Sequence, residues 1–137
     1  MPPQTAHRHP VRVYYEDTDL AGIVYYANYL KFIERGRSEW VRGLGIDQMR
    51  LRAEQGIVFA VRRVEADYLR PGRFGDDLEV TTELLELGAS RIDLRQEVWR
   101  GEERLFTSHV TLVCLHDAGR AARIPTDVRG LLQPVRS

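Results

Sequence analysis

The sequence lacks several features that would place it in a specialised class of protein. It has one cysteine, Cys114, so it cannot form an internal disulfide, which suits a reducing compartment. No run approaches the roughly 18 apolar residues of a membrane span, and the N-terminal MPPQTAHRHP lacks the apolar core of a signal peptide. Lys plus Arg and Asp plus Glu number 20 each, which removes the global positive charge expected of a nucleic-acid-binding protein. We therefore expect a cytoplasmic protein with no nucleic-acid partner and no membrane span.

Common catalytic and metal-binding motifs are also missing. There is no G-x-S-x-G sequence for a serine hydrolase and no glycine motif for binding phosphate. Cys114 lies in an apolar segment with no motif around it, which is typical of a buried small hydrophobe rather than a nucleophile. His109 and His116 have opposite parity in one predicted strand, so they face opposite sides and do not form a ligand pair.

The length and the hydrophobic periodicity predict a single domain over residues 1–137, with residues 1–10 as a loose tail. VRVYY (11–15) alternates like a short strand. From about residue 24 to 42 the spacing changes to that of a helix with one apolar face, formed by Tyr25, Tyr29, Phe32, Ile33 and Trp40. Gly43 and Gly45 end this helix, and a short second helix begins at a cap, Asp47, and stops at Gly56. A last short helical turn is expected after Pro125, with Thr126 as its cap.

After Gly56 the period becomes two and predicts four strands, up to 68, over 78–84 and 92–98, and over 105–116. Short turns between them predict a meander, which makes the strands antiparallel, and the more continuously apolar 105–116 is expected to be central. One long helix covers only one face of such a sheet. The edges and ends of the sheet stay uncovered, which predicts a homodimer whose sheets meet edge to edge.

Three carboxylates, those of Glu16, Asp17 and Asp19, stand in four positions ahead of the predicted apolar helix. The residues alone leave three interpretations open. The group forms a solvated acidic loop whose last carboxylate caps the helix. Alternatively, Asp17 and Asp19 begin a metal site, although hard cations usually recruit more oxygen ligands than these. In the third interpretation one carboxylate is a catalytic base or nucleophile, and amides at the helix start are oxyanion donors.

The residues that follow fit the chemistry of the third interpretation. Gly22 lets the backbone adopt a positive φ or approach a substrate closely. The first turn of the helix leaves N–H groups unsatisfied, and these can hold a carbonyl oxygen as it gains charge beside Asp19. Apolar walls would come from Tyr25, Tyr26 and Tyr29. Composition does not decide between the three interpretations.

The segment VRVYYEDTDLAGIVYYANYLKFIERGRSEWVR closely resembles the hotdog-fold acyl-CoA thioesterases, in particular the Tol-Pal-associated branch of the 4-hydroxybenzoyl-CoA thioesterase family. From Asp17 to Tyr29 it matches the family pattern of Asp-x-Asp, a small-residue and glycine turn, two apolar residues, an aromatic pair, a small residue, Asn and Tyr. The similarity continues through FAVRRVEADYLRPGRFGDDLEV and TLVCLH. It implies an α+β hotdog fold, an antiparallel β-sheet wrapped around one long central α-helix. It also implies hydrolysis of an acyl-CoA to a carboxylic acid and coenzyme A, with no metal and no organic cofactor.

The resemblance also implies roles for individual residues. Asp19 is the nucleophile or general base, the N–H of Tyr26 is the oxyanion donor, and Tyr15 lies where the branch often has a tyrosine near the reacting centre. The branch commonly has histidine in place of Tyr26, and a phenol transfers protons poorly near neutral pH, which puts rate and acyl preference in question. Asn28 matches the family asparagine that braces the loop. The implied substrate-binding residues are Gly22, Val24, Tyr25, Asn28, Val61, Arg62, Ser90 and Arg91.

Coenzyme A carries phosphates, which arginine binds well. The candidates are Arg62, Arg63, Arg70, Arg73 and Arg91. Arg91 follows the Gly88-Ala89-Ser90 break, where related enzymes place nucleotide contacts near the dimer seam. The resemblance implies a homodimer or homotetramer with each active site built from two chains, and an acyl carrier protein is a further candidate partner.

Two other functions compete with acyl-CoA hydrolysis. A hotdog hydratase is disfavoured because its usual Asp/His pair is not evident. A non-catalytic protein that keeps the hotdog scaffold and binds acyl carrier protein or a cell-envelope complex is the alternative from another class. Release of free thiol from acyl-CoA substrates would separate the enzyme from the binding protein.

Overall fold

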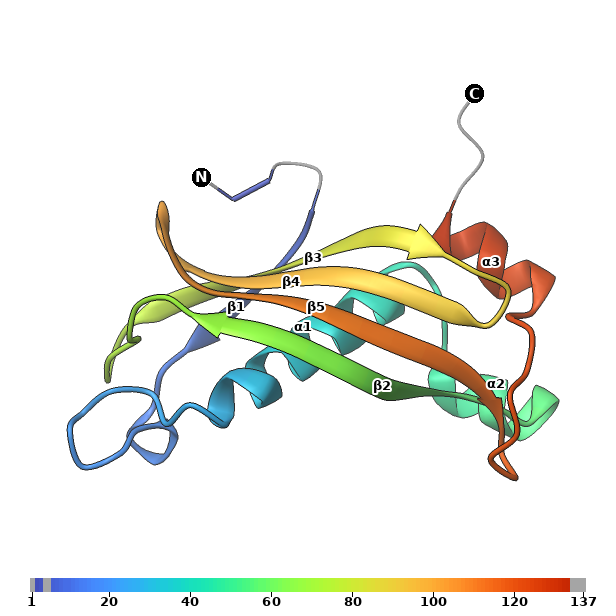
Figure 1. Ribbon diagram of the computed structural model, residues 1–137, viewed down its shortest axis with the longest axis horizontal. Coiled ribbons are helices and arrows are strands. Elements are labelled where there is room, and N and C mark those ends of the chain that lie inside the picture. Colours follow the sequence, from blue (N-terminus) through green and yellow to red (C-terminus); the bar gives the residue numbers. More distant parts are fainter. Residues whose placement is uncertain (1, 4–5, 134–137) are drawn as a thin grey trace.

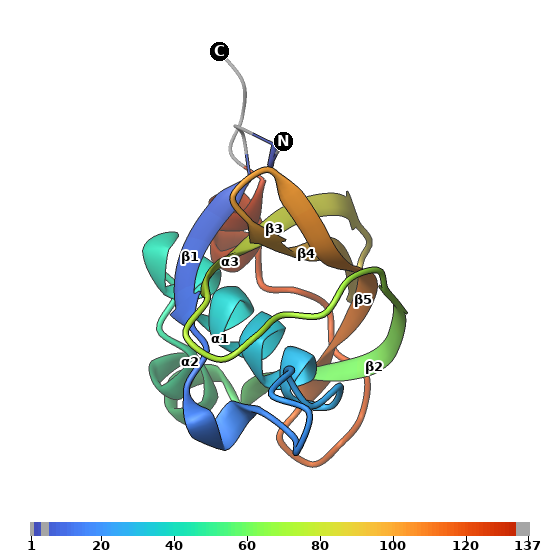
Figure 2. The ribbon, with the colours of Figure 1, turned by 90° about the vertical axis from the view of Figure 1, so that its left-hand side faces the viewer.

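A computed structural model describes residues 2–3 and 6–133. A five-stranded antiparallel sheet curves around a long helix, α1 (Asn28–Gly43), as the end-on view shows (Figures 1 and 2). The strands lie in the order β1-β3-β4-β5-β2. Their bounds are β1 (His7–Arg12), β2 (Ile57–Tyr68), β3 (Asp77–Leu87), β4 (Arg91–Arg100) and β5 (Glu103–His116). Two short helices, α2 (Gln48–Gln55) and α3 (Thr126–Leu132), lie toward the end of the sheet remote from the start of α1 (Figure 1). The predicted α+β class is confirmed.

Helix α1 forms because its apolar residues return to one side every three or four positions. Tyr29, Phe32, Ile33 and Trp40 are buried, as predicted. The predicted start at residue 24 is wrong, and so is the place of Tyr25 on the buried face. The N–H of Tyr25 donates to the carbonyl of Asp17 at 2.9 Å, so this residue belongs to a turn outside the helix and is 48% exposed.

The sheet confirms the antiparallel strands, and β5 is an interior strand between β4 and the edge strand β2, although the middle strand is β4. The predicted meander is wrong for its first connection. β2 pairs with β5 and not with β3, so residues 69–76 carry the chain from one edge of the sheet to the far side of β4. Alternation of side chains determines which face each residue occupies, but it does not determine which strands are neighbours.

The first strand begins earlier than predicted. β1 covers His7–Arg12 and pairs with β3 from His7 opposite Thr82 to Arg12 opposite Asp77. Residues 7–10, predicted as part of a loose tail, therefore belong to the sheet. Pro10 is compatible with the strand because β1 is an edge. Residues 15–17, predicted in part as strand, form a 3₁₀ turn, Tyr15–Asp17.

The two predicted ends of α2 are confirmed. The Asp47 side chain accepts a hydrogen bond from the Arg50 N–H at 3.1 Å, and Gly56 has φ +65°, the left-handed conformation that stops a helix. In α3, Thr126 is the first helical residue and Pro125 precedes it, so the predicted cap is one position late. None of the helices in the described part of the chain has the length and apolar character needed to cross a membrane.

Close approach of α1 to the sheet requires Gly36. A Cβ added there would lie 2.5 Å from Cγ1 of Val80, a fully buried and β-branched side chain on β3. We expect Gly36→Ala to lower the free energy of unfolding by about 1–3 kcal/mol, because overpacking outweighs the better helix propensity of alanine. Chemical denaturation measures this change.

Gly43, the last residue of the same helix, is the matched control because a Cβ there would meet nothing within 4 Å. Gly43→Ala is expected to change stability by less than about 1 kcal/mol. Equal effects of the two substitutions would contradict the packing explanation.

Candidate active site

The acidic segment forms a small hairpin ahead of α1. Thr18 bridges to Val24, and the N–H of Asp19 donates to the carbonyl of Ile23 at 2.9 Å. Gly22 closes the hairpin with φ +76°, a conformation that other residues adopt at a cost. The Asp19 side chain is exposed at the tip, where its Oδ1 accepts a hydrogen bond from the Ala21 N–H at 2.8 Å. This leaves a carboxylate on the surface, held in a defined orientation.

The segment just before α1 offers main-chain donors. Within the described residues, the N–H groups of Tyr26 and Ala27 form no hydrogen bond to protein, whereas the Tyr25 N–H donates to Asp17. Free amides at a helix start carry partial positive charge and can bind a carbonyl oxygen. Asn28 holds this geometry, because its Nδ2 donates to the same Asp17 carbonyl at 2.9 Å. This hydrogen bond agrees with the predicted bracing of the loop by Asn28, whose predicted contact with substrate stays a prediction.

The two aspartates of the segment have different environments. Asp17 is 9% exposed, and its Oδ2 accepts a hydrogen bond from the Tyr14 N–H at 2.8 Å. Its carboxylate therefore ties together the turn that precedes the hairpin. Of these two carboxylates, that of Asp19 faces solvent, where a substrate can reach it. Within residues 2–3 and 6–133, no group of three or more His, Cys, Asp or Glu side chains has the arrangement of a metal site.

The hairpin docks on the connection between β2 and β3. The Val24 N–H donates to the Gly72 carbonyl at 2.8 Å, and the Phe74 N–H donates to the Gly22 carbonyl at 3.2 Å. The hydroxyl of Tyr29, the second residue of α1, accepts the Gly72 N–H at 2.9 Å. A Cβ at Gly72 would lie 3.1 Å from Val24 and 3.3 Å from the Tyr29 hydroxyl, so glycine permits this close approach.

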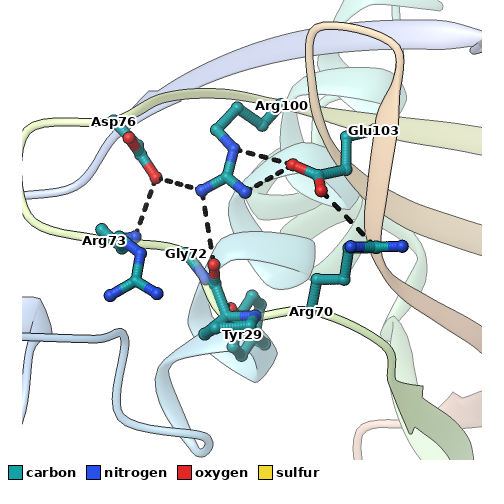
Figure 3. A network of polar contacts seen from close by, with 8 residues as sticks. Tyr29, Arg70, Gly72, Arg73, Asp76, Arg100 and Glu103 are labelled. Carbon is teal, nitrogen blue, oxygen red and sulfur yellow. Dashed lines mark hydrogen bonds and ion pairs between the residues drawn. The ribbon is translucent and has the colours of Figure 1, made fainter.

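An arginine in turn fixes that connection (Figure 3). Arg100, at the end of β4, donates to the Asp76 carboxylate at 2.7 Å and to the Pro71 carbonyl at 3.3 Å, and it also binds Glu103. The Arg73 N–H donates to the same carboxylate oxygen of Asp76 at 2.8 Å. Burial disfavours the charged form of Asp76, but the hydrogen bonds from Arg100 and Arg73 outweigh it and lower the pKa of this carboxyl.

Sequence reasoning missed this part of the site. It treated the segment between the strands that end at 68 and begin at 78 only as a short turn, and it assigned no role to Arg100. The one available signal was Gly72 itself, since a glycine in a connection often marks a close approach of the backbone to another segment. The hydrogen-bond partners of Gly72, which are Tyr29 and Val24, lie 43 residues or more away in sequence, so no local pattern shows them.

Exposed aromatic rings surround the start of α1. The rings of Tyr25 and Tyr26 lie 5.0 Å apart, and the ring of Tyr26 lies 6.1 Å from that of Tyr68 at the end of β2. Tyr15, predicted near the reacting centre, is 83% exposed and packs its ring against Phe74 at 6.3 Å. Val24 is 4% exposed, so its side chain belongs to the core and only its main chain takes part in the hairpin.

The remaining predicted site residues lie in the other half of the sheet. Val61 and Arg62 are exposed in the middle of β2, seven and six residues from Tyr68, which puts Val61 about 23 Å from that end of the strand. Arg91 lies across β5 from Ala60, through their common partner Val113. A single chain therefore gathers Asp19, Gly22, Tyr25, Tyr26 and Asn28, but does not bring Val61, Arg62, Ser90 and Arg91 to them.

These distant residues differ in how far they are engaged. Arg91 pairs with Asp93 at 3.0 Å, and the carbonyl of Ser90 accepts the Cys114 N–H at 2.7 Å. Arg62 stands at a bulge in β2 and forms no ion pair with the described residues. Cys114 is fully buried, and burial raises the pKa of its thiol, which confirms that it packs in the core.

Comparison with known proteins identifies the family. The family model described as "Thioesterase superfamily" matches residues 21–107, which is more than half of the chain. The chain belongs to the thioesterase superfamily. The sequence prediction of a hotdog-fold thioesterase is thereby confirmed.

Three relatives of this thioesterase illustrate the match. The acyl-CoA thioester hydrolase YbgC of Escherichia coli O6:H1 is 39% identical over 112 residues, which cover 81% of this chain and 83% of that protein. The acyl-CoA thioesterase YbgC of Haemophilus influenzae is 40% identical over 111 residues, with 81% of each chain covered. A solved structure, a probable thioesterase from Bartonella henselae, superimposes with a TM-score of 0.83 at 34% identity and covers 88% of this chain and 100% of its own.

In this thioesterase, the Tyr29 hydroxyl is expected to hold the connection between β2 and β3 against the start of α1. Tyr29→Phe leaves the ring in place but removes the acceptor for the Gly72 N–H, a buried contact. We expect a loss of about 1–3 kcal/mol in the free energy of unfolding, measured by chemical denaturation. Tyr68→Phe is the control, because Tyr68 packs against Tyr29 but its hydroxyl bonds to no described residue. That variant should stay within about 0.5 kcal/mol of the wild type, and a similar loss in both would contradict the role of the hydroxyl.

Proposed function

We propose that this thioesterase hydrolyses acyl-CoA thioesters with Asp19 as the catalytic carboxylate and the N–H of Tyr26 as an oxyanion donor. One observation carries the proposal: an exposed, oriented carboxylate and an unbonded main-chain N–H lie on one docked segment at the start of α1. The similarity to acyl-CoA thioester hydrolases of other bacteria supports coenzyme A as the thiol. The single buried cysteine is compatible with a cytoplasmic location, which is part of the same proposal.

Two routes of hydrolysis fit this arrangement. In one, Asp19 attacks the thioester carbonyl, the carbon–sulfur bond breaks to release the coenzyme A thiolate, and water cleaves the resulting anhydride. In the other, Asp19 removes a proton from a water molecule that attacks directly, and the thiolate leaves with the electron pair. Both routes place negative charge on the carbonyl oxygen, where the Tyr26 N–H would donate. A well-placed donor of this kind is worth roughly 3 kcal/mol.

Proton transfer at the helix start has to proceed without an imidazole. Tyr26 presents an exposed phenol there, and a phenol exchanges protons poorly near neutral pH compared with histidine. A released thiolate is a good leaving group, so the reaction does not require a strong acid at this point. The phenol and the neighbouring rings of Tyr25 and Tyr68 then serve to enclose the acyl group rather than to transfer protons.

The free edge of β2 supports a site shared between two chains. β2 is a twelve-residue edge strand with Val61, Val64 and Tyr68 exposed on it. Antiparallel pairing of two β2 strands would reverse their ends, so that the Tyr68 end of one chain lies beside the part of the partner near Val58 to Val61. This pairing would bring the residues that a single chain keeps apart to the Asp19 hairpin. A homodimer is therefore the proposed minimal unit, with a tetramer as a further assembly.

The phosphates of coenzyme A would find arginine near this seam. Arg62 is exposed and forms no ion pair with the described residues, so its guanidinium is available to an anion. Arg91 lies across the sheet from β2, but its guanidinium already pairs with Asp93. Arg62 is accordingly the stronger of these two candidates for a phosphate contact.

The first test replaces each aspartate of the hairpin segment by its amide. Asp19→Asn is expected to lower kcat by about 10²–10⁴-fold, because the isosteric amide is neither base nor nucleophile. Asp17→Asn is the matched control and should cost far less activity, because Asn still offers an acceptor to the Tyr14 N–H. Release of free thiol from a panel of acyl-CoA substrates measures both.

Wild-type turnover in Asp19→Asn, without deamidation, would refute the assignment of Asp19. An equal loss in both variants, with activity that chelation removes and Mg²⁺ restores, would favour a shared metal instead. Absence of thiol release by the wild-type protein with every acyl-CoA tested would refute the enzymatic proposal.

The shared site predicts complementation between chains. Asp19→Asn removes the carboxylate, and Val61→Trp fills the space beside β2 that the partner's hairpin would need. Each variant alone should be nearly inactive, whereas a mixed dimer keeps one site with both parts intact. We expect recovery toward half of the wild-type rate per mixed dimer, with dimer formation checked by sedimentation. A fully active monomer, or mixed dimers no more active than their parents, would refute the shared site.

A further inference from the structure

A cavity beneath the C-terminal half of α1 lies outside the catalytic segment. Its volume is about 160 Å³, and it lies between α1, the concave face of the sheet and α3. Most of its lining is apolar and comes from the buried side chains of Trp40, Val41, Ile92, Leu112 and Leu132 and the partly buried ring of Phe59. An apolar cavity of roughly 150 Å³ in another protein holds a benzene molecule. The space is therefore large enough for a compact aromatic or short aliphatic group.

A cation without a carboxylate partner lines this apolar space. Arg37 is half-buried, and its Nη1 donates to the side-chain carbonyl of Gln96 at 2.9 Å. It forms no ion pair with any described residue, in contrast to many arginines of the sheet. Burial lowers the pKa of Arg37, although guanidinium remains charged, so its charge is only partly compensated in this position.

The neighbouring groups leave room for an anion. Gln96 is fully buried, and its amide nitrogen donates to the Ile33 carbonyl at 2.8 Å and the Thr82 hydroxyl at 2.9 Å, which orients its oxygen toward Arg37. Gln96 therefore holds the guanidinium of Arg37 through an uncharged oxygen, which does not neutralise its positive charge. Glu34 is the other charged residue of the lining; its charge opposes the lowering of the Arg37 pKa, but it forms no ion pair with Arg37 and is exposed, so solvent screens part of its charge. A guanidinium has five N–H donors, and the structure engages few of them.

We propose that this cavity binds a compact apolar group that ends in a carboxylate, with Arg37 as the counter-ion of that carboxylate. The apolar walls take the body of the ligand, and the free N–H groups of Arg37 take its charge. Such a carboxylate has two sources, a free carboxylic acid or the far end of an acyl chain held at the catalytic site. The second source rests on the proposed function, because Phe59 and Val61 also belong to the part of β2 that would face the partner's hairpin.

The binding test uses benzoate and its uncharged analogue benzyl alcohol, titrated calorimetrically into the full-length protein. We expect benzoate to bind with one site per chain, and Arg37→Gln to weaken it by about tenfold or more. Arg35→Gln is the control, because it removes the same charge from the exposed face of the same helix. Arg37→Lys, which keeps a positive charge, should lose less affinity than Arg37→Gln, and thermal denaturation checks that each variant is folded.

The kinetic test distinguishes the two sources. Hexanoyl-CoA and adipoyl-CoA differ in the carboxylate at the far end of the chain. If that carboxylate reaches Arg37, the ratio of kcat/KM for adipoyl-CoA over hexanoyl-CoA falls about tenfold or more in Arg37→Gln but not in Arg35→Gln. An unchanged ratio together with lost benzoate binding supports the free acid as the ligand.

The proposal is overturned if benzoate binds no better than benzyl alcohol, or if neither benzoate binding nor the substrate ratio depends on Arg37. This outcome differs from failure of the proposed function. A protein that binds benzoate through Arg37 but releases no thiol from any acyl-CoA refutes the hydrolase and supports the cavity. A protein that hydrolyses acyl-CoA, but whose benzoate binding and substrate ratio do not change in Arg37→Gln, supports the hydrolase and refutes the cavity proposal.

Discussion

The candidate site depends on one connection, residues 69–76, being held against the start of α1. Gly72 is the contact point, because it bonds both the hairpin, through Val24, and the helix, through the Tyr29 hydroxyl. The connection has to pass from one edge of the sheet to the far side of β4, and Arg100 fixes it by binding Asp76 and the Pro71 carbonyl (Figure 3). Ion pairs at a surface contribute little singly, but here the hydrogen bonds of Arg100 act together with main-chain hydrogen bonds that tie the connection to the hairpin and to β5.

Local features of the fold could be predicted from the sequence because each has a local cause. The cap at Asp47 and the stop at Gly56 depend on a few adjacent residues, and the strands depend on their own alternation. The position of β2 beside β5 could not be predicted in this way. β2 would bury the same face whether it paired with β3, as the meander requires, or with β5, as it does. Only the path of residues 69–76 around the end of α1 distinguishes the two arrangements.

The proposed catalytic segment shows the same division between local and distant causes. The hairpin with its exposed Asp19 and the free amides at Tyr26 follow from a contiguous motif, so the resemblance located them. The groups that hold the segment come from Gly72 and Arg100, far along the chain. The early start predicted for α1 failed for a related reason, because the Asp17 carbonyl, eight residues earlier, takes the Tyr25 N–H out of the helix.

The proposed pairing of β2 edges would divide chemistry and substrate selectivity between the two chains. An antiparallel pair of strands reverses the direction of each chain relative to the other, so residues at opposite ends of one sheet become neighbours across the seam. The Asp19 hairpin lies at one end of the chain's sheet, and the cavity with Arg37 opens along the part of β2 nearer the other end. A dimer of this kind would let one chain supply the reacting groups while its partner supplies the walls around the acyl group. Substitutions in the cavity could then alter the choice of substrate without disturbing the hydrogen bonds that orient Asp19 in the same chain.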